Sequence, residues 1–476
     1  MVFRRELVIF SLLSFITNFN SAFVNTSLGT SLDRLDFFIS NSLKRRGYVH
    51  YEASISLWRN TIMSAWFAGE VFGIVFTPGL TDRYGRRFSY LISIGTSVIA
   101  TCVQLWGIYL EDPEGVIIGR LLSALESSSV HIRGSMSYLC EIGFLFMNLA
   151  GYTVGMLDFA VDSLYQLFVL QLAIQLSFLI PMLFIPETPK YLLLTKEDRE
   201  ASERSMNFFQ GTTSFRYGLL NEINIEAWTE EVSPTFWEMV RTLHLRNALI
   251  LTVMVLVPTL SMTTMVSTAS LVVGQAGATK WQTSEAPLIM LTVVLFSSIC
   301  GSTLVDLYPR RALLLISGTA CSILLVFFAI FTNLSQMDFA YRLPERLRFV
   351  VLITYSAFFG IGVGPFSWFL GCELVSQRHR STMYSATFAA QQVLGAAMTA
   401  MEETMNKEIG SASLIIMFVI PAFFALLYLY FYLPETMARE SSEIVNQMAS
   451  RGSFALTRNE SIYSVSASMY SSMSVY

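Results

Sequence analysis

Charged side chains are scarce in this chain. Asp, Glu, Lys and Arg account for only 14% of the 476 residues, whereas soluble globular proteins carry about 25%. Apolar residues make up 53%, and the mean hydropathy is +0.52. A core of this size cannot hide so much apolar surface from water, so much of the chain must have lipid as its solvent. The formal net charge of −4 gives no indication of a nucleic-acid partner.

Cysteine and histidine are few and scattered. The five cysteines lie in or beside apolar runs and none lies near another, which excludes a disulfide framework and is typical of small buried side chains. The four histidines are equally dispersed. The sequence shows no metal-ligand spacing and no nucleophile–base constellation. We therefore expect no metal site, no cofactor and no enzymatic activity.

Long apolar runs are abundant. A helix needs about 20 apolar residues to cross the hydrocarbon core of a bilayer. The eleven runs that approach this length are 7–28, 60–80, 88–110, 136–157, 164–185, 247–273, 286–305, 312–332, 348–371, 381–401 and 411–433. A twelfth candidate, Val116–Leu125, is only ten residues long and contains Arg120. The first run follows two arginines and lacks a small-residue cleavage site, so we expect a membrane helix and not a cleaved signal.

The runs fall into two hydrophobic halves. Residues 1–185 form the predicted N-terminal transmembrane half and residues 247–436 the C-terminal one. The polar, charged stretch 186–246 between them predicts a helical cytoplasmic linker. Residues 437–476 are polar and rich in serine, which is typical of a disordered tail.

Arginine and lysine near the ends of the runs predict the orientation in the membrane. With a cytoplasmic N-terminus, the same side carries most loop arginines and the 186–246 linker, and the acidic clusters lie on the opposite side. Two basic groups, Lys44–Arg46 and Arg342–Arg348, run against this trend. The majority places both termini in the cytoplasm. That placement requires an even number of spans, so the short twelfth segment must count as a span in some form.

The two halves repeat one another. Thr81-Asp-Arg-Tyr-Gly-Arg-Arg87 follows the second run, and Val305-Asp-Leu-Tyr-Pro-Arg-Arg311 follows the run that ends at residue 305; four of the seven residues are identical. Pro186-Glu-Thr188 and Pro434-Glu-Thr436 close the last run of each half. Duplicated six-helix halves are a known transporter architecture.

Carboxylate and guanidinium groups gather on the predicted cytoplasmic side of both halves. Arginines there satisfy the topology rule on their own, but an acidic residue such as Asp82 contributes little to topology. Exposed ion pairs contribute only about 0.2–1 kcal/mol each, whereas a network of several could shift a conformational equilibrium about tenfold or more. We predict a gating network made of Asp82, Arg83, Arg86, Arg87, Glu126, Arg133, Glu187, Asp306, Arg310, Arg311, Glu373, Arg380 and Glu435.

The first of these loops resembles the signature of the major facilitator superfamily. Pro186-Glu-Thr-Pro-Lys-Tyr-Leu-Leu193 is similar to the sugar-porter signature, and Gly362-Val-Gly-Pro-Phe-Ser-Trp-Phe369 with Glu373 and Arg380 extends the match. The chain resembles the animal facilitative glucose transporters. The resemblance implies an all-α fold of twelve helices in two six-helix halves, a central site between the halves and passive movement of hexoses. We expect a monomer in the plasma membrane.

The resemblance also locates the expected sugar contacts, where this chain departs from its relatives. Pro258, Thr259, Thr264, Thr268 and Ala269 replace the amide and tyrosine residues of the seventh helix, and Val294 replaces an asparagine of the eighth. A missing hydrogen-bond partner costs about 1–3 kcal/mol. The predicted substrate-binding residues that remain are Gly364, Pro365, Trp368, Gln391, Gln392 and Asn20. Trp368 is equally compatible with a packing role, and Asn25, Gln166, Gln171 and Gln175 are weaker candidates.

The fourth helix is unusually short. In the family, about twenty residues separate the two positions that correspond to Arg120 and Glu126. In this chain the two residues are six positions apart. A ten-residue stretch covers about 15 Å of a core about 30 Å thick. Three explanations stay open: a splice or gene-model variant, a short helix buried in protein, or loss of the span.

The sequence thus predicts a facilitative hexose carrier that works by alternating access. No charged residue is placed in the middle of a helix with confidence, which favours uniport over proton symport. The alternatives are a transporter-like membrane protein that acts as a sensor or binds a partner, and a carrier of another solute such as an organic ion. The expected partners are a small neutral solute and the lipid bilayer.

Overall fold

The computed structural model describes the chain in separate ranges, and those ranges are helical. They are 2–47, 51–124, 136–156, 163–194, 196–210, 236–262, 265–266, 280–336, 343–376, 379–437, 439, 443–445 and 447–448. No strand occurs within them. Several predictions fall outside the described residues: those on Glu126, Arg133, Thr264, Thr268, Ala269 and most of the 437–476 tail.

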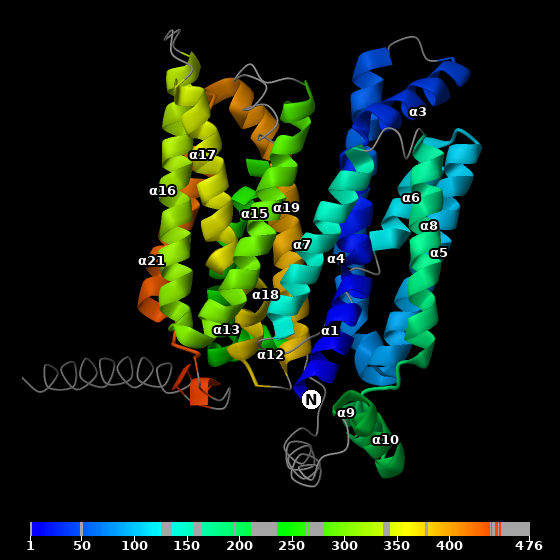
Figure 1. Cartoon of the computed structure of the whole chain (residues 1–476), viewed down its shortest axis with the longest axis vertical. Coiled ribbons are helices and arrows are strands. Elements are labelled where there is room, and N and C mark those ends of the chain that lie inside the picture. Colours follow the sequence, from blue (N-terminus) through cyan, green and yellow to red (C-terminus); the bar gives the residue numbers. More distant parts are fainter. Residues whose placement is uncertain are drawn as a thin grey trace, which may run out of the picture.

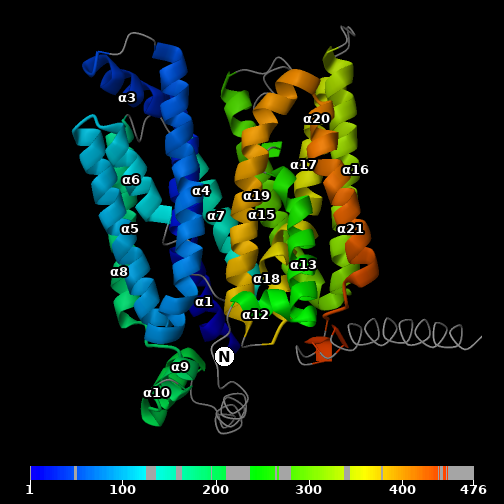
Figure 2. The same ribbon diagram turned by 180° about the vertical axis from the view of Figure 1, so that it is seen from behind.

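The helices form two side-by-side groups (Figures 1 and 2). The first group contains α1 (Val2–Asn18), η1 (Phe19–Val24), α2 (Asn25–Gly29), α3 (Leu32–Arg45), α4 (Tyr51–Tyr84), α5 (Arg86–Tyr109), α6 (Pro113–Ala124), α7 (Met136–Met156) and α8 (Leu164–Phe184). The second contains α12 (Phe236–Arg241), α13 (Leu243–Leu256), η3 (Val257–Leu260), α15 (Lys280–Leu307), α16 (Arg310–Gln336), α17 (Leu343–Phe358), η4 (Phe359–Val363), α18 (Gly364–Glu373), α19 (Arg380–Ile409), α20 (Ala412–Leu414), η6 (Ile415–Val419) and α21 (Ile420–Tyr432).

The two ends of the molecule differ. The short helices α9 (Pro189–Leu194) and α10 (Arg199–Gln210) lie at the same end as the N-terminus, whereas α3 lies at the opposite end (Figure 1). We call the end with the N-terminus the inner end and the end with α3 the outer end.

Eight helical segments among the described residues are long and apolar enough to cross a membrane. They are Arg86–Tyr109, Leu139–Met156, Leu164–Phe184, Leu243–Leu260, Glu285–Val305, Arg310–Leu334, Arg346–Glu373 and Ala412–Tyr432. Each coincides with a predicted run. The other three predicted runs correspond to the consecutive helices α1, η1 and α2, to α4 and to α19. The chain is therefore a multi-pass membrane protein, and the total of eleven full spans stays a prediction.

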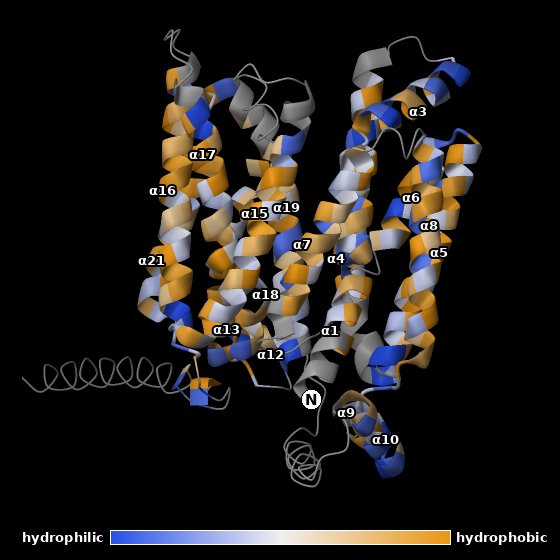
Figure 3. Cartoon of the chain, viewed as in Figure 1, coloured by the Kyte–Doolittle hydropathy of each residue, from blue (hydrophilic) through white to orange (hydrophobic). Residues whose placement is uncertain are grey.

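Apolar side chains cover the outward faces of these helices. Figure 3 shows hydrophobic residues along the lengths of the helices and hydrophilic residues gathered towards their ends. On α21, Phe423, Phe424 and Phe431 expose 59%, 63% and 63% of their surface. Exposed aromatic side chains in such number are unfavourable in water and suit a lipid environment.

Helix α6 is described over twelve residues, Pro113–Ala124, and residues 125–135 lie outside the described part of the chain. The described residues span about 18 Å, and the shortening of the fourth helix stays a prediction. It begins at Pro113 after a tight turn in which Glu111 has a φ of 57°. Gly107 of α5 and Gly115 of α6 let the two backbones approach closely, because a Cβ added at Gly115 would lie 2.8 Å from Gly107 Cα. The short helix is thus packed against protein along the face that meets α5.

Three of the basic residues that run against the topology trend have a structural explanation. At the outer end, Arg46 donates to Glu114 at 2.7 Å (Nη1 to Oε1) and pairs with Asp112. The Arg46 guanidinium holds the pKa of Glu114 down at about 2. Arg45 pairs with Glu111 at 3.3 Å. In the C-terminal half Arg348 is only 1% exposed, so it lies inside the helical bundle and is not a free loop charge.

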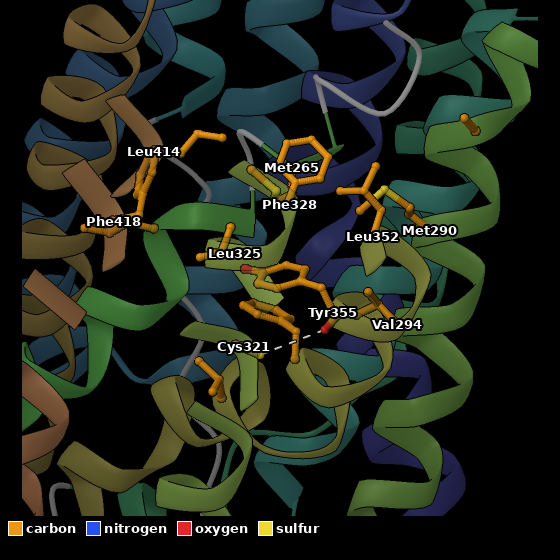
Figure 4. Packing of buried hydrophobic residues seen from close by; sticks show 14 of the residues in the cluster. Met265, Met290, Val294, Cys321, Leu325, Phe328, Leu352, Tyr355, Leu414 and Phe418 are labelled. Atoms are coloured by element: carbon orange, nitrogen blue, oxygen red, sulfur yellow. Dashed lines mark hydrogen bonds between the residues drawn. The ribbon is translucent and has the colours of Figure 1, made fainter. Parts of the chain in front are cut away.

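The core of the C-terminal half holds its helices together through methionine, leucine and aromatic side chains. Met290 and Val294 of α15, Leu325 and Phe328 of α16, and Tyr355 of α17 pack together (Figure 4). The Tyr355 hydroxyl lies 2.6 Å from Ser261 Oγ, so the one polar group in this set has a partner. Val294 is fully buried here. At the position where the resemblance predicts an asparagine, this chain therefore has a core residue.

Candidate functional site

The carboxylate of Glu187 caps the first turn of α5 at the inner end. Its oxygens accept hydrogen bonds from the backbone N–H groups of Arg86 at 2.9 Å and of Arg87 at 3.0 and 3.1 Å. Gly85 makes this approach possible, because it has a φ of 94° and a Cβ there would lie 2.6 Å from Glu187 Oε2. A negative charge at a helix N-terminus is favourable to the helix dipole. The Arg87 side chain binds the Leu183 carbonyl at 2.8 Å.

The C-terminal half repeats this arrangement. Glu435 accepts the backbone N–H groups of Arg310 at 3.0 Å and of Arg311 at 3.2 Å, at the start of α16. The Arg311 side chain binds the Tyr430 carbonyl, and Arg310 forms an ion pair with Glu373. In both halves the proline–glutamate motif therefore binds the helix that follows the arginine loop. These contacts lie within each half. Glu187 and Glu435 accept backbone N–H groups, whereas Glu373 pairs with a guanidinium, that of Arg310.

A small cavity lies between α18 and α19 in the C-terminal half. Its walls are mostly neutral, with hydroxyl, amide and aromatic side chains: Ser367, Trp368, Gly371, Cys372, Tyr384, Thr387, Phe388 and Gln391. The Trp368 ring lies 6.0 Å from the Phe388 ring of α19 and 5.5 Å from the Phe144 ring of α7 (centroid distances). Trp368 therefore joins the cavity of one half to a helix of the other half.

The family profile described as "Sugar (and other) transporter" matches residues 7–448. The chain belongs to this sugar transporter family. It is 25% identical over 397 residues to mouse "Solute carrier family 2, facilitated glucose transporter member 3", covering 78% of both chains. It is 26% identical over 401 residues to member 1 from chicken, covering 79% of this chain and 80% of that one.

Solved structures of the major facilitator superfamily share the fold. The proton:xylose symporter XylE bound to 6-bromo-6-deoxy-D-glucose matches with a TM-score of 0.76 at 15% identity, covering 94% of this chain and 99% of that chain. The inward-open form of XylE from E. coli matches with a TM-score of 0.65 at 16% identity, over 93% of this chain and 99% of that chain. The arrangement of helices is therefore that of a major facilitator transporter.

The structure brings together some of the predicted substrate-binding residues of this sugar-transporter chain. Trp368 and Gln391 line the same cavity. Gly364 and Pro365 are buried at the start of α18, directly after the π-helical turn η4. Gln392 is half-buried beside Gln391 on α19.

Asn20 lies apart from this cavity, in the N-terminal half. Its side-chain oxygen accepts from Gln175 at 2.9 Å, and its amide donates to Ser97. Gln175 also binds Ser97 at 2.8 Å and accepts from Thr101 at 2.9 Å. This buried network joins η1, α5 and α8, and it occupies both ends of the Asn20 amide. The role of Asn20 in this conformation is to connect helices.

Part of the predicted gating network can be located. Arg83 and Arg86 are exposed at the inner end, and the Arg83 carbonyl accepts from the Tyr191 hydroxyl at 3.0 Å. Arg380 is half-buried at the start of α19. Asp82 and Asp306 lie in the last turns of α4 and α15, and their side chains are outside the described part. The gating role of the set stays a prediction.

Three charged residues are buried within helices, although the sequence indicated no clear charged residue in the middle of a membrane helix. Glu70 of α4, Arg120 of α6 and Glu141 of α7 are 2%, 0% and 3% exposed. Arg120 donates to Asn25 Oδ1 at 2.8 Å, lies 5.2 Å from the Trp66 ring centroid and is attracted electrostatically by Glu70. The available signal was the presence of single charges inside otherwise apolar runs, since such charges face protein and not lipid.

Proposed function

We propose that this chain is a facilitative carrier of hexose-type sugars that works by alternating access as a uniporter. Membership of the sugar transporter family supports transport as the general activity. The relatives named facilitated glucose transporters support a sugar substrate. The observation that carries the proposal is the cavity at Trp368, which lies against the contact between the two halves.

The chemistry of the cavity suits a small neutral polyol. The flat face of Trp368 can pack against the C–H face of a pyranose, and the Gln391 amide offers both a donor and an acceptor. Hydroxyl groups of Ser367, Thr387 and Tyr384 complete the polar lining. No Asp, Glu, Lys or Arg lines this cavity, which disfavours an organic ion as its occupant.

The ends of the helices provide what alternating access requires. The capped starts of α5 and α16 hold the inner end of each half as a rigid unit. The span Arg346–Glu373 contains the π turn η4 followed by Gly364 and Pro365, and π turns interrupt regular helix pairing and often occur at functional sites. We propose that this span bends there when the halves move, and that the predicted gating residues close the inner end.

The orientation, the cellular membrane and the oligomeric state of the carrier are part of the same proposal. Basic residues at the inner end, including exposed Arg83 and Arg86, favour a cytoplasmic position for that end and for both termini. Salt bridges neutralise two of the basic residues found at the outer end. We propose the plasma membrane as the site and a monomer as the working unit.

Uptake of radiolabelled D-glucose and D-fructose into cells that lack endogenous hexose carriers tests the proposal. We expect saturable uptake that Trp368→Ala lowers at least about tenfold, because a lost stacking and packing surface at a central site costs more than about 1.4 kcal/mol. Trp106→Ala is the matched control, since Trp106 is 64% exposed on α5. Absence of saturable uptake of both sugars, with the protein present at the surface, would overturn the proposal.

A further inference from the structure

A buried carboxyl group lies where the two halves meet. Glu141 belongs to α7 and lies inside the apolar span Leu139–Met156, with 3% of its surface exposed. An ionisable side chain inside a membrane helix is rare, and by default it points to a function. Neither the capped helix starts nor the cavity lining makes use of this group.

The carboxyl of Glu141 contacts the bending segment of the other half. Its Oε1 lies against Gly364, where an added Cβ would be 3.2 Å from it. Trp368, one turn further along α18, is its hydrogen-bonding neighbour, and an indole N–H can only donate. The second oxygen, Oε2, is buried and has no hydrogen-bond partner. One Trp368 side chain thus touches both the carboxyl and the cavity.

No counter-charge approaches Glu141 within the described part of the chain. The described elements packed most extensively against α7 are α1, η1, α2, α15 and α18; η1 and α2 carry no charged residue. The charged residues of the others lie towards the helix ends: Arg4, Arg5 and Glu6 of α1, Lys280, Glu285 and Asp306 of α15, and Glu373 of α18, which pairs with Arg310. The Cys140 thiol lies beside Glu141. The Tyr384 phenol interacts in turn with Cys140, Cys372, Tyr90 and Glu70. Thiols and phenols are neutral in water at neutral pH.

Burial makes the ionised form of this carboxyl unfavourable. An unpaired carboxylate removed from water costs far more free energy than the neutral acid, which keeps an O–H donor and no net charge. When the central site is open to water, the carboxylate can be hydrated; when the halves close around it, this hydration is lost. Closure and proton binding are therefore linked, because each favours the other.

We propose that Glu141 binds a proton when the halves close over the central site and releases it when the site reopens to water. A proton from the aqueous side forms an O–H bond at Oε2, and on reopening that bond breaks and the proton returns to water; no other bond changes. Because Glu141 contacts the helix that bends at Gly364, its protonation state controls how readily the closed form is reached. The transport consequence rests on the proposed carrier function, whereas the proton site itself does not.

Infrared difference spectroscopy of the full chain reconstituted in lipid vesicles tests the proton site directly. A protonated carboxyl has a carbonyl band that a carboxylate lacks, and we expect one such band to titrate as the buffer is taken from acidic to alkaline. Glu141→Gln should remove this band. Glu70→Gln is the matched control, because Glu70 is also a buried carboxyl of the N-terminal half but has Arg120 as a counter-charge. We expect the titrating band to be unchanged in that variant.

Two outcomes would overturn the proton site: a titrating band that persists in Glu141→Gln, or no protonated carboxyl band in the unmodified chain. If Glu141→Gln does not fold, Glu141→Asp keeps a carboxyl at the same place, and the band should then persist at a shifted position. An unshifted band in Glu141→Asp would count against the assignment.

Uptake of labelled D-glucose into the same vesicles tests the consequence for transport. Over about three pH units we expect the rate of the unmodified chain to change at least about tenfold, as for one linked proton, and the Glu141→Gln rate to stay flat. A Glu141→Gln profile that follows the unmodified one would overturn the link. Absence of uptake at every pH, with the infrared result intact, would refute the carrier function and leave the proton site standing.

Discussion

Removal of the Glu187 carboxylate should loosen the start of α5 without affecting the start of α16. In Glu187→Ala the backbone N–H groups of Arg86 and Arg87 lose their acceptors at 2.9–3.1 Å. Loss of a capping side chain costs about 0.5–2 kcal/mol, and hydrogen bonds to a charged group lie at the upper end of that range. A loss of one to two kcal/mol corresponds to about a 5–30-fold change in the local opening equilibrium.

Amide hydrogen exchange of the purified chain measures this opening. Peptides that cover the first turn of α5 should exchange about 5–30-fold faster in Glu187→Ala, with a smaller rise in Glu187→Gln, which keeps one oxygen acceptor. Peptides from the first turn of α16 should be unchanged. Glu435→Ala is the reciprocal control, since Glu435 caps α16 through Arg310 and Arg311. Equal loosening of both helices in either variant, or no change at the capped turn, would refute the claim that each carboxylate caps its own half.

Two further predictions concern the short helix and the outer end. Gly107→Ala should destabilise the contact between α5 and α6 by about 1–3 kcal/mol, because its Cβ would lie 2.9 Å from Val116 N. Thermal unfolding of this variant should therefore show a lower midpoint. Gly95→Ala on the same helix is the control and should leave the midpoint unchanged, because nothing lies within 4 Å of a Cβ at that position. The Arg46–Glu114 pair should weaken only in acid: the pKa of Glu114 falls from about 4.5 to about 2, so the pair contributes fully above pH 4.5 and is lost as the pH falls through 2. Hydrogen exchange of α3 across that range checks this, and loosening of α3 already near neutral pH would contradict it.

The repeated motifs indicate which residues gather at the inner end, because a motif that ends one helix and a loop that begins another are local features. The structure adds the contact of Glu187 with the start of α5 and the equivalent contact of Glu435 with the start of α16. The repeat did not predict which groups donate hydrogen bonds to these carboxylates. A carboxylate near two arginines can accept from a guanidinium or from the backbone. The backbone is chosen in both halves, with Gly85 before the arginines in the first half and Pro309 in the second.

Positions inside the bundle were harder to predict, because lipid and neighbouring helices are both apolar and leave little periodic pattern in a membrane helix. Trp368 and Gln391 meet in one cavity as the resemblance suggests, but Asn20 is held in a separate network with Gln175. Glu141 was missed because one carboxyl changes little in the hydropathy of an apolar run. Helix α6 is described as far as Ala124, and Glu126, on which the predicted shortening of this helix depends, lies outside the described residues.

Counterflow in reconstituted vesicles tests the central claim most directly. Vesicles loaded with unlabelled D-glucose and diluted into labelled D-glucose should accumulate the label transiently above equilibrium, because an alternating-access carrier exchanges faster than it returns empty. Trp368→Ala should abolish this overshoot and Trp106→Ala should retain it. Uptake that rises only to equilibrium, or that is the same in vesicles without the protein, would contradict a carrier that moves hexoses through the site at Trp368.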